Sequence, residues 1–386
     1  MYELRGFVRP DGRVGFRNHV LVLPTVACVS EVAMRVAMKV EGVVAVWNPY
    51  GCTQIGRDLE ITTRTLIGIG RNPNVFAVLV LGLGCETVDT DKVADAIAKT
   101  GKPVEVVRVQ DVGGILRAEE LATSIVARFR QEASVQRRVS VDFSSLVVAV
   151  ECGGSDTTSG IAANPVVGYV ADRVIDLGGT VIMSEVPEMI GAEHILVKRA
   201  VSREVAEKLL QLIREWEELA KSAGADIRGS QPTPGNIAGG ITTLEEKSLG
   251  AILKGGTRPI VGVLDYAEEP KSRGLWVMNT PGFDIESVTG MVAGGAQVVL
   301  FTTGRGTPVG SAIAPVIKVT ANSETYRKMR DIIDFYAGTV IEGVETIKQV
   351  GEKLFKELIE VLNGKLTKSE ILKHREFGIM KVSPSL

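Results

Sequence analysis

One stretch of the chain decides its fold class: residues 75–99 read VFAVLVLGLGCETVDTDKVADAIAK. Its first seven residues are all apolar, which is typical of a strand that is buried on both faces. A glycine-containing loop follows, and residues 88–99 then place apolar residues at helical spacing. A buried strand that a short loop joins to a helix is the repeating unit of a parallel, doubly wound sheet.

The same pattern recurs on both sides of this stretch. Further strands are predicted at residues 19–26, 43–47, 104–107, 146–150, 180–183, 260–264, 274–278, 298–301 and 316–319. The charged residues 128–140 separate two series of strands, so a boundary is predicted near residue 140. The sequence therefore predicts an α/β protein with two domains, residues 1–140 and 141–386, each built on a mainly parallel sheet.

The composition is that of an ordinary globular protein. Of the 386 residues 45% are hydrophobic and 23% are charged, which excludes global disorder. The net charge of -2 argues against nucleic acid or an anionic membrane surface as a partner. The N-terminal residues are charged and broken by Pro10, and an apolar run of about 20 residues is absent, so neither a secretory signal nor a membrane span is expected. We expect a cytoplasmic protein.

Four cysteines follow predicted strands or lie in glycine-bearing loops: Cys28, Cys52, Cys85 and Cys152. In the cytoplasm they are expected to be thiols, metal ligands or cluster ligands rather than disulfides. The carboxyl ends of parallel strands form the ligand crevice of a doubly wound sheet, so all four could lie at one edge. Thiols that fill space at strand ends are the alternative, and the sequence leaves both interpretations open. A zinc ribbon is not expected because a CxxC pair is absent.

Residues 151–160, ECGGSDTTSG, form the segment most typical of a binding site. Ser155 and Asp156 stand between a predicted strand and a predicted helix. Free backbone N–H groups at such a helix start could hold a carboxylate or a phosphate. The alternative is a capped junction in which Ser or Asp serves as the N-cap residue.

Acidic residues and a histidine gather in residues 184–196, SEVPEMIGAEHIL. Glu188 and His194 could bind a divalent metal or perform general acid–base chemistry. A charged helix start, favoured by the helix dipole, explains the pattern equally well.

Three further loops supply polar candidates. Residues 234–250 contain Asn236 and Lys247, and residues 301–310 contain Thr303 and Arg305. Arg57 is a weaker candidate, since a loop arginine is usually solvated. An arginine with nearby backbone donors suits a planar carboxylate. The GxGxxG fingerprint and the P-loop are both absent, which leaves a nicotinamide or ATP site without sequence support.

Long segments of the chain together resemble the altronate/galactarate dehydratase family, a group of sugar-acid hydro-lyases. The matching segments are GRVGFRNHVLVLPTVAC, GCTQIGRDLEITTRTLIGIGRNPNV, VLGLGCE, ECGGSDTTSGIAANPVVG, SEVPEMIGAEHIL, GNIAGGITTLEEKSLG, MNTPGFDIESVTGMVAGGAQVVLFTTGRGTPVG and PVIKVTAN. The resemblance implies a dimerising α/β domain followed by a Rossmann-like domain with a crossover and a metal site. It also implies an iron-dependent β-elimination of water from an altronate- or galactarate-like acid, which yields a 2-keto-3-deoxy acid.

Roles for the candidate residues follow as hypotheses from this chemistry. Thiols close to Fe(II) are assigned to Cys52, Cys85 and Cys152, with Mn(II) or an iron–sulfur cluster as alternatives. A ligand or acid–base function is assigned to Glu188 and His194, and Lys247 is a candidate base if burial lowers its pKa. Contacts to the substrate are assigned to Ser155, Asp156, Asn236, Thr303, Arg305 and Arg57.

One departure from the family pattern affects the expected assembly. Many relatives carry a small β-rich domain before the region where this chain begins, so a separate small β-rich subunit is expected, with a homodimer of this chain. The large subunit of a sulfolactate sulfo-lyase is similar too and would release sulfite. A non-catalytic subunit that binds a sugar acid is a further alternative, and a nicotinamide dehydrogenase is a distant one.

Overall fold

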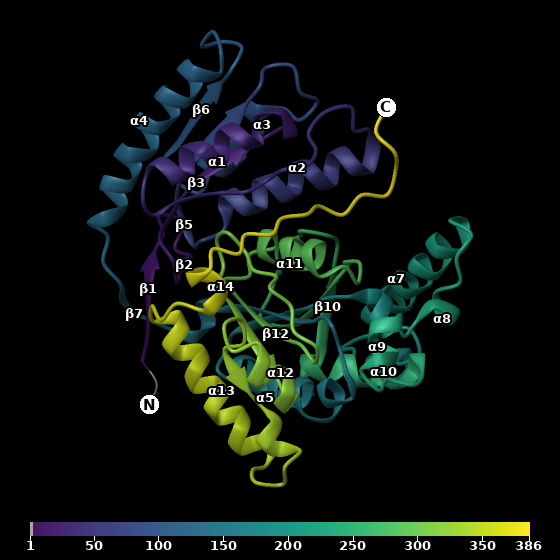
Figure 1. The fold of residues 1–386 in the computed structure, drawn as a ribbon. Helices are drawn as coiled ribbons and strands as arrows, with labels where there is room; N and C mark the ends of the chain where they lie inside the picture. Colours follow the sequence, from purple (N-terminus) through teal and green to yellow (C-terminus); the bar gives the residue numbers. More distant parts are fainter. Residues whose placement is uncertain (1–2) are drawn as a thin grey trace.

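Two parallel sheets form the framework of the chain, and a small antiparallel sheet joins them (Figure 1). The structure is a computed structural model that describes residues 3–386. The first sheet has the order β4-β3-β5-β6. Its strands are β3 (His19–Pro24), β4 (Val43–Ala45), β5 (Val75–Gly82) and β6 (Val104–Arg108). Its helices are α1 (Ser30–Lys39), α2 (Gly56–Arg71), α3 (Thr90–Ala98) and α4 (Ile115–Ser134), with a short helix η1 (Ala27–Val29) before α1.

The second sheet has seven strands in the order β10-β11-β9-β8-β12-β13-β14, all parallel. They are β8 (Val147–Cys152), β9 (Thr180–Met183), β10 (Ile260–Leu264), β11 (Gly274–Met278), β12 (Val298–Thr302), β13 (Val316–Thr320) and β14 (Phe335–Tyr336). The antiparallel sheet consists of β1 (Leu4–Val8), β2 (Val14–Gly15) and β7 (Val139–Val141).

Helices cover both faces and both ends of the second sheet. The long ones are α5 (Asn164–Asp176), α7 (Arg203–Ser222), α11 (Asp284–Ala293) and α13 (Ile347–Leu362). The shorter α-helices are α6 (Glu193–Lys198), α8 (Ile227–Ser230), α9 (Pro234–Ala238), α10 (Leu244–Ala251), α12 (Ser323–Lys328) and α14 (Lys368–Ile371). Other short helical turns are η2 (Phe143–Ser145), η3 (Ser159–Ala163), η4 (Val186–Met189), η5 (Ile252–Gly255) and η6 (Gly338–Val340).

The strand order confirms the predicted fold class, an α/β protein with mainly parallel sheets and a crossover in the second. From β8 the chain runs outward to β9, places β11 between β10 and β9, and then crosses back so that β12 pairs with β8 on its other side. Strand β8 is therefore the point at which the order reverses. Ligands of open α/β sheets bind at the carboxyl ends of the strands at this switch point.

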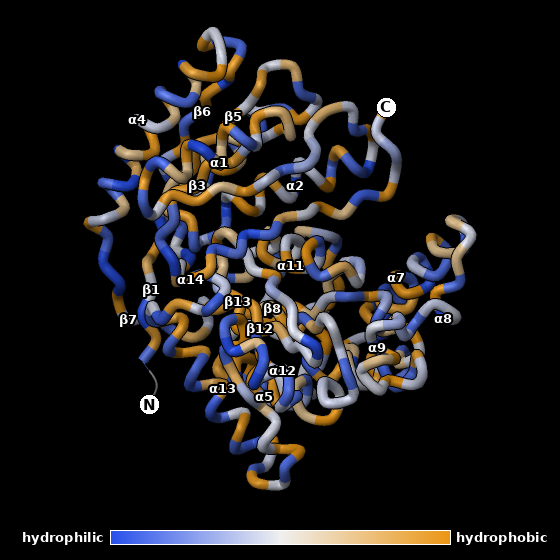
Figure 2. Tube along the Cα trace, in the orientation of Figure 1, coloured by the Kyte–Doolittle hydropathy of each residue, from blue (hydrophilic) through white to orange (hydrophobic). Residues whose placement is uncertain are grey.

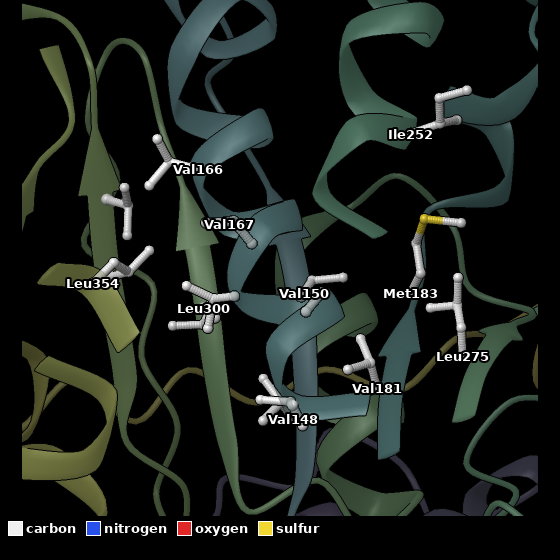
Figure 3. Packing of buried hydrophobic residues seen from close by; sticks show 14 of the residues in the cluster. Val148, Val150, Val166, Val167, Val181, Met183, Ile252, Leu275, Leu300 and Leu354 are labelled. Atoms are coloured by element: carbon white, nitrogen blue, oxygen red, sulfur yellow. The ribbon is translucent and has the colours of Figure 1, made fainter. Parts of the chain in front are cut away.

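Alternating residues of the second sheet feed two separate cores. Val148 and Val150 of β8 pack with α5 on one face, and Figure 3 shows them beside Val166 and Val167 of that helix. Ala149 belongs to the core on the other face, which contains residues of α11 and of α2. Figure 2 shows the matching pattern, with hydrophobic residues concentrated inside and hydrophilic ones along the outer helices.

The four-stranded sheet with its helices is called the first unit, and the seven-stranded sheet with its helices the second unit. The C-terminal segment connects the two units. It leaves α14, runs between α2 and α11, and ends beside the first unit (Figure 1). The backbone N–H groups of Val382 and Ser383 both donate to the buried carboxylate of Asp58, at 2.8 Å each. Within residues 3–386, we find no helix with the length and apolarity needed to cross a membrane.

Candidate active site

Strand β8 ends in two functional side chains that point to opposite faces of the sheet. Glu151 accepts a hydrogen bond from Ser287 of α11 at 2.7 Å. Cys152 lies on the other face, where Nζ of Lys254 from η5 is 3.1 Å from its Sγ. The alternation of a strand therefore places an acid on the α11 side and a thiol on the α5 side of the same strand end.

Glu185 lies between these two groups, just beyond the end of β9. Its backbone adopts a left-handed conformation with φ at +66°, which costs a non-glycine residue about 1–3 kcal/mol. Three contacts hold it there. Its N–H donates to Oγ1 of Thr280 at 2.8 Å, and its Oε2 accepts from the Cys152 N–H at 2.9 Å and from Lys254 Nζ at 2.6 Å. The surrounding structure therefore fixes this carboxylate against local strain.

A thiol–lysine group occupies the α5 side. Oε2 of Glu188 lies 3.2 Å from the Cys152 sulfur, and Oε1 of Glu188 lies 2.7 Å from Nζ of Lys247. The side chains of both lysines are nearly buried, with 6% of Lys247 and 2% of Lys254 exposed. The structure thus brings together the predicted residues Cys152, Glu188 and Lys247.

A set of three acidic side chains lies on the α11 side. One oxygen each from Glu151, Glu185 and Asp284 lie within 4.8 Å of one another. The Oε2 atom of Glu151 also accepts from Ser184 Oγ at 2.7 Å. A Cβ atom at Gly153 would lie 2.2 Å from Oδ2 of Asp284, so the glycine permits the close approach of α11 to β8.

Burial and charge set the protonation of these groups. Burial, together with Glu185, raises the pKa of Glu151 well above its usual range and that of Asp284 to about 7. Burial also acts to raise the pKa of Glu188, but Lys247 and Lys254 outweigh it and the pKa falls below its usual value. Burial alone would lower the pKa of Lys247, yet Glu188 raises it. Lys247 is therefore a stable ammonium group, and the condition stated for its role as a base is not met.

The donor set fits a divalent cation. The residues on the two sides of β8 together form the cluster: Glu151, Cys152, Glu185, Glu188, Lys247, Lys254 and Asp284. Its carboxyl groups outnumber its two lysines, so the buried cluster has more acidic than basic groups. Oε1 of Glu151 and Oε1 of Glu185 are buried and have no hydrogen-bond partner. Unpartnered buried carboxylate oxygens are costly unless a cation or a proton meets them. Hard oxygen ligands of this kind suit divalent cations such as Mn(II).

A cavity of about 290 Å³ opens beside the thiol–lysine group. Lys247 lines it, together with the predicted substrate residues Ser155 and Asp156. Asn236 lies next to this wall, since its Nδ2 donates to the Ser155 carbonyl at 3.0 Å. A concave space with a few convergent polar groups is the usual form of a small-molecule site.

Asp156 organises the loop that forms this wall. Its Oδ1 accepts from Thr158 Oγ1 at 2.6 Å and from the Ser159 N–H at 3.1 Å. Its Oδ2 accepts from Nδ2 of Asn322 at 2.8 Å. The capping alternative raised by the sequence therefore describes the contacts of Asp156 well.

In the part of the chain that the structure describes, the remaining predicted residues, His194 with its ligand or acid–base role and the substrate contacts Thr303 and Arg305, make no hydrogen bond or ion pair with the buried acids, thiol and lysines. His194 is exposed on α6. Thr303 is buried and accepts from the Gly306 N–H at 2.9 Å, which stabilises a turn. The exposed Arg305 donates to the Gly235 carbonyl at 2.8 Å.

Arg57 lines a different cavity, of about 200 Å³, between α2 and α7. It also pairs with Asp265, with 3.5 Å between Nη2 and Oδ1. Asn279, which follows β11, also lines this cavity, and its Oδ1 accepts from Trp216 Nε1 at 2.9 Å. Arg57 therefore lies at the junction of the two units.

The predicted trio of thiols is not assembled. Cys152 is buried in the second unit, whereas Cys52 and Cys85 are exposed on loops of the first. Two groups of metal-ligand atoms converge within 4.8 Å in the part of the chain that the structure describes, and neither contains Cys52 or Cys85. Their role near a metal stays a prediction.

Sequence reasoning missed Lys254 and Asp284 and gave no role to Glu151 and Glu185. Lys254 stands in the apolar segment AILKGG and gives no local sign of function. A stronger signal was available for the acids, because Glu151 ends a buried strand and Glu185 follows another. An acid at the end of a fully apolar strand needs a partner, which is itself evidence for a site.

Comparison with known proteins gives the family. Residues 143–385 match the family model described as D-galactarate/altronate dehydratase, C-terminal, and residues 6–134 match the one described as D-galactarate dehydratase/altronate hydrolase, second domain. The chain belongs to the D-galactarate/altronate dehydratase family. This confirms the resemblance found in the sequence and the prediction of an enzyme of the lyase class.

Individual relatives differ in length and in reaction. The chain is 41% identical to the (2R)-sulfolactate sulfo-lyase subunit beta of Chromohalobacter salexigens, over 98% of this chain and 97% of that protein. It is 38% identical to the altronate dehydratase of Escherichia coli, over 100% of this chain and 79% of that protein. It is 37% identical to the galactarate dehydratase (L-threo-forming) of Escherichia coli, over 94% of this chain and 73% of that protein.

Proposed function

We propose that this member of the family is a hydro-lyase that removes water from a sugar acid similar to altronate or galactarate and forms a 2-keto-3-deoxy acid. The supporting observation is the buried cluster at the switch point of the second sheet. There a chain of contacts runs from Lys247 through Glu188 and Cys152 to Lys254 and Glu185, and Lys247 lines a cavity large enough for a small acid.

The reaction requires two kinds of help from the protein. The hydrogen on C2 is weakly acidic, so its removal needs a base and positive charge near the enediolate that develops. Hydroxide leaves C3 poorly unless a proton or a cation assists. The enol product then becomes the 2-keto-3-deoxy acid by tautomerisation.

The residues of the cluster supply both kinds of help. Glu188 is held as a carboxylate by the lysines and is the proposed base. Lys247, which lines the cavity and contacts Glu188, keeps its proton and stabilises negative charge on the substrate. Lys254 contacts both Glu185 and Cys152 through its Nζ and so fixes their positions. The Ser155–Asp156 loop and Asn236 form the wall that orients the acid.

A divalent metal completes the proposal, with Fe(II) as the first candidate and Mn(II) as the second. Glu151, Glu185 and Asp284 would hold it through their converging oxygens. When bound, such an ion supplies Lewis acidity toward the oxygens of a hydroxy acid.

A sulfo-lyase is the second candidate function, because the chain is 41% identical to a sulfo-lyase subunit. The identity to the three dehydratases is 36–38%, slightly lower than the identity to this subunit. Sulfolactate also carries a hydroxyl on C2 and a leaving group on C3. The same proton removal would therefore expel sulfite and leave pyruvate after tautomerisation.

The name of the sulfo-lyase relative supports a second subunit. We propose that a separate small chain completes the enzyme, as the word "subunit" in the sulfo-lyase's name indicates for that protein. A homodimer of this chain and a cytoplasmic location belong to the same proposal. Substrate binding without turnover, even with the small chain present, would indicate a binding subunit instead.

Anaerobic turnover on a substrate panel tests the function. The chain is assayed with Fe(II) and thiol, with and without the candidate small subunit, on altronate, galactarate and sulfolactate. Release of a 2-keto-3-deoxy acid from one sugar acid is expected. Release of sulfite would select the second candidate, and silence across the panel with iron bound would contradict both.

A further inference from the structure

Three exposed cysteines lie on loops at the carboxyl edge of the first sheet, and none of them belongs to the groups of ligand atoms found in the second. Cys28 follows β3, Cys52 follows β4 and Cys85 follows β5. These strands are neighbours in the order β4-β3-β5. Parallel strands release their chains at the same edge, so the three thiol-bearing loops emerge side by side.

Backbone hydrogen bonds lock these loops together. The Ala27 N–H, one residue before Cys28, donates to the Tyr50 carbonyl at 2.7 Å. The Thr87 N–H donates to the Gly51 carbonyl at 3.0 Å, which ties the Cys85 loop to the Cys52 loop. A Cβ at Gly51 would lie 2.0 Å from the Thr25 carbonyl oxygen, so the loop packs directly on the end of β3. The three loops that carry the thiols are therefore connected to one another at this edge.

Two side-chain amides flank the thiols. Nε2 of Gln110 donates to the sulfur of Cys85 at 3.5 Å. Gln54 is 2% exposed, and its Oε1 accepts from the Gly51 N–H at 3.2 Å, whereas its buried Nε2 has no partner. A buried amide donor without an acceptor is costly and marks a place where an acceptor belongs. Sulfide and thiolate sulfur accept such bonds, which tune iron–sulfur centres.

We infer that Cys28, Cys52 and Cys85 bind a [4Fe–4S] cluster at this edge. Each thiolate would bind one iron, and the fourth iron would have no cysteine ligand. The Gln54 and Gln110 amides would donate to sulfur atoms of the site. This inference is independent of the proposed function, because it concerns another sheet edge and another set of ligands.

The described residues show no preformed three-thiol site for a single ion. Thiolates around one ion must converge, yet the three cysteines form no group of ligand atoms within 4.8 Å in residues 3–386. Thiolates of a cubane bind separate irons and stand farther apart. The cysteines are also exposed, so a preassembled cluster could reach them without unfolding of the chain.

Iron and sulfide analysis tests the inference without reference to turnover. The full chain is reconstituted anaerobically with Fe(III), a thiol reductant that converts part of it to Fe(II), and sulfide; it is then desalted and analysed for iron, acid-labile sulfide and visible absorbance. About four irons and four sulfides per chain and a broad visible band are expected. Cys28→Ser, Cys52→Ser and Cys85→Ser should each lose most of this content, while circular dichroism confirms the fold.

Cys152→Ser is the matched control, because it removes the buried thiol of the other unit and should keep the cluster. Gln54→Leu should keep the fold and shift the reduction potential or weaken retention of the cluster. A chain that retains no sulfide, or three cysteine variants that keep full content, would overturn the inference. Stoichiometric zinc without sulfide would overturn it as well. A cluster in a chain without lyase activity would support the inference and count only against the proposed function.

Discussion

The carboxyl edges of the two parallel sheets differ in almost every property of their polar residues. The first presents three exposed thiols on loops that hydrogen bonds lock together. The second buries carboxylates, a thiol and two lysines, and holds Glu185 in a strained conformation. The same strand–loop–helix unit therefore supports one edge with exposed thiols and another with buried carboxylates and lysines. Only the second edge has the electrostatics of acid–base catalysis, because burial makes each charge there depend on its neighbours.

Removal of the proposed base should give the largest effect. Glu188→Gln keeps the shape of the side chain but cannot accept the C2 proton, so turnover should fall by about 100-fold or more. Steady-state kinetics on the substrate that the panel identifies measure this. The control is Glu193→Gln, which changes an acid of the same segment that pairs with Arg228 on the surface. Equal losses in both variants would contradict the assignment.

Removal of a buried lysine from the second edge should lower the free energy of unfolding. Lys254→Met leaves Glu185 and Cys152 without their ammonium partner, and the free energy of unfolding should fall by about 3–5 kcal/mol. Urea denaturation of the two proteins at pH 7 measures the difference. The control Lys208→Met breaks the exposed pair with Glu204 and should cost no more than about 0.5 kcal/mol. A loss as small as that of the control would contradict the buried network.

Replacement of another buried lysine, Lys318, should raise the free energy of unfolding instead of lowering it. Lys318 is fully buried in β13, and its Nζ has no hydrogen-bond partner, although it lies 5.9 Å from the centroid of the Phe301 ring. Burial lowers its pKa to about 8. The unfolded chain binds this proton more tightly, so the charged lysine destabilises the fold below pH 8 and the penalty fades as the pH rises toward about 10.4.

Lys318→Met should therefore stabilise the chain by about 2–3 kcal/mol at pH 7. The advantage should shrink between pH 8 and pH 10. Denaturation of the wild type and the variant across this pH range gives the comparison. An advantage that does not change with pH, or a destabilised variant at pH 7, would contradict the account of Lys318.

The exposed thiols should matter least for the metal-free fold. Cys52→Ser should change the free energy of unfolding by less than about 0.5 kcal/mol, whereas the buried Cys152→Ser should cost on the order of 1 kcal/mol. Thermal denaturation of both variants after treatment with a chelator measures this contrast. A large loss at Cys52 in metal-free protein would show that its loop contributes to the core.

The sequence predicted the strands well and the site only in part. Continuous apolar runs such as residues 75–81 identify buried strands directly, because such runs are stable only inside a sheet. The site residues Cys152, Glu188 and Lys247 were found because strand ends and charged loops can be recognised locally. Lys254 could not be found this way, since its function comes from a packing of η5 against β8 that no local pattern encodes.

The grouping of the cysteines shows the same limit. The sequence places all four near strand ends, but it does not say which strands belong to one sheet edge. The structure separates Cys152 from the other three because β8 belongs to the second sheet. Spacing along the chain thus predicts candidates, and topology decides which of them can meet.

Manganese binding and turnover measured on the same samples test the central claim, that the lyase reaction occurs at the second edge. Mn(II) is titrated into metal-free wild type and Glu185→Gln while electron paramagnetic resonance records the free ion, and each sample is then assayed on the identified substrate. We predict one tightly bound ion and turnover in the wild type, and the loss of both in the variant. Tight binding and full turnover in Glu185→Gln would contradict the account.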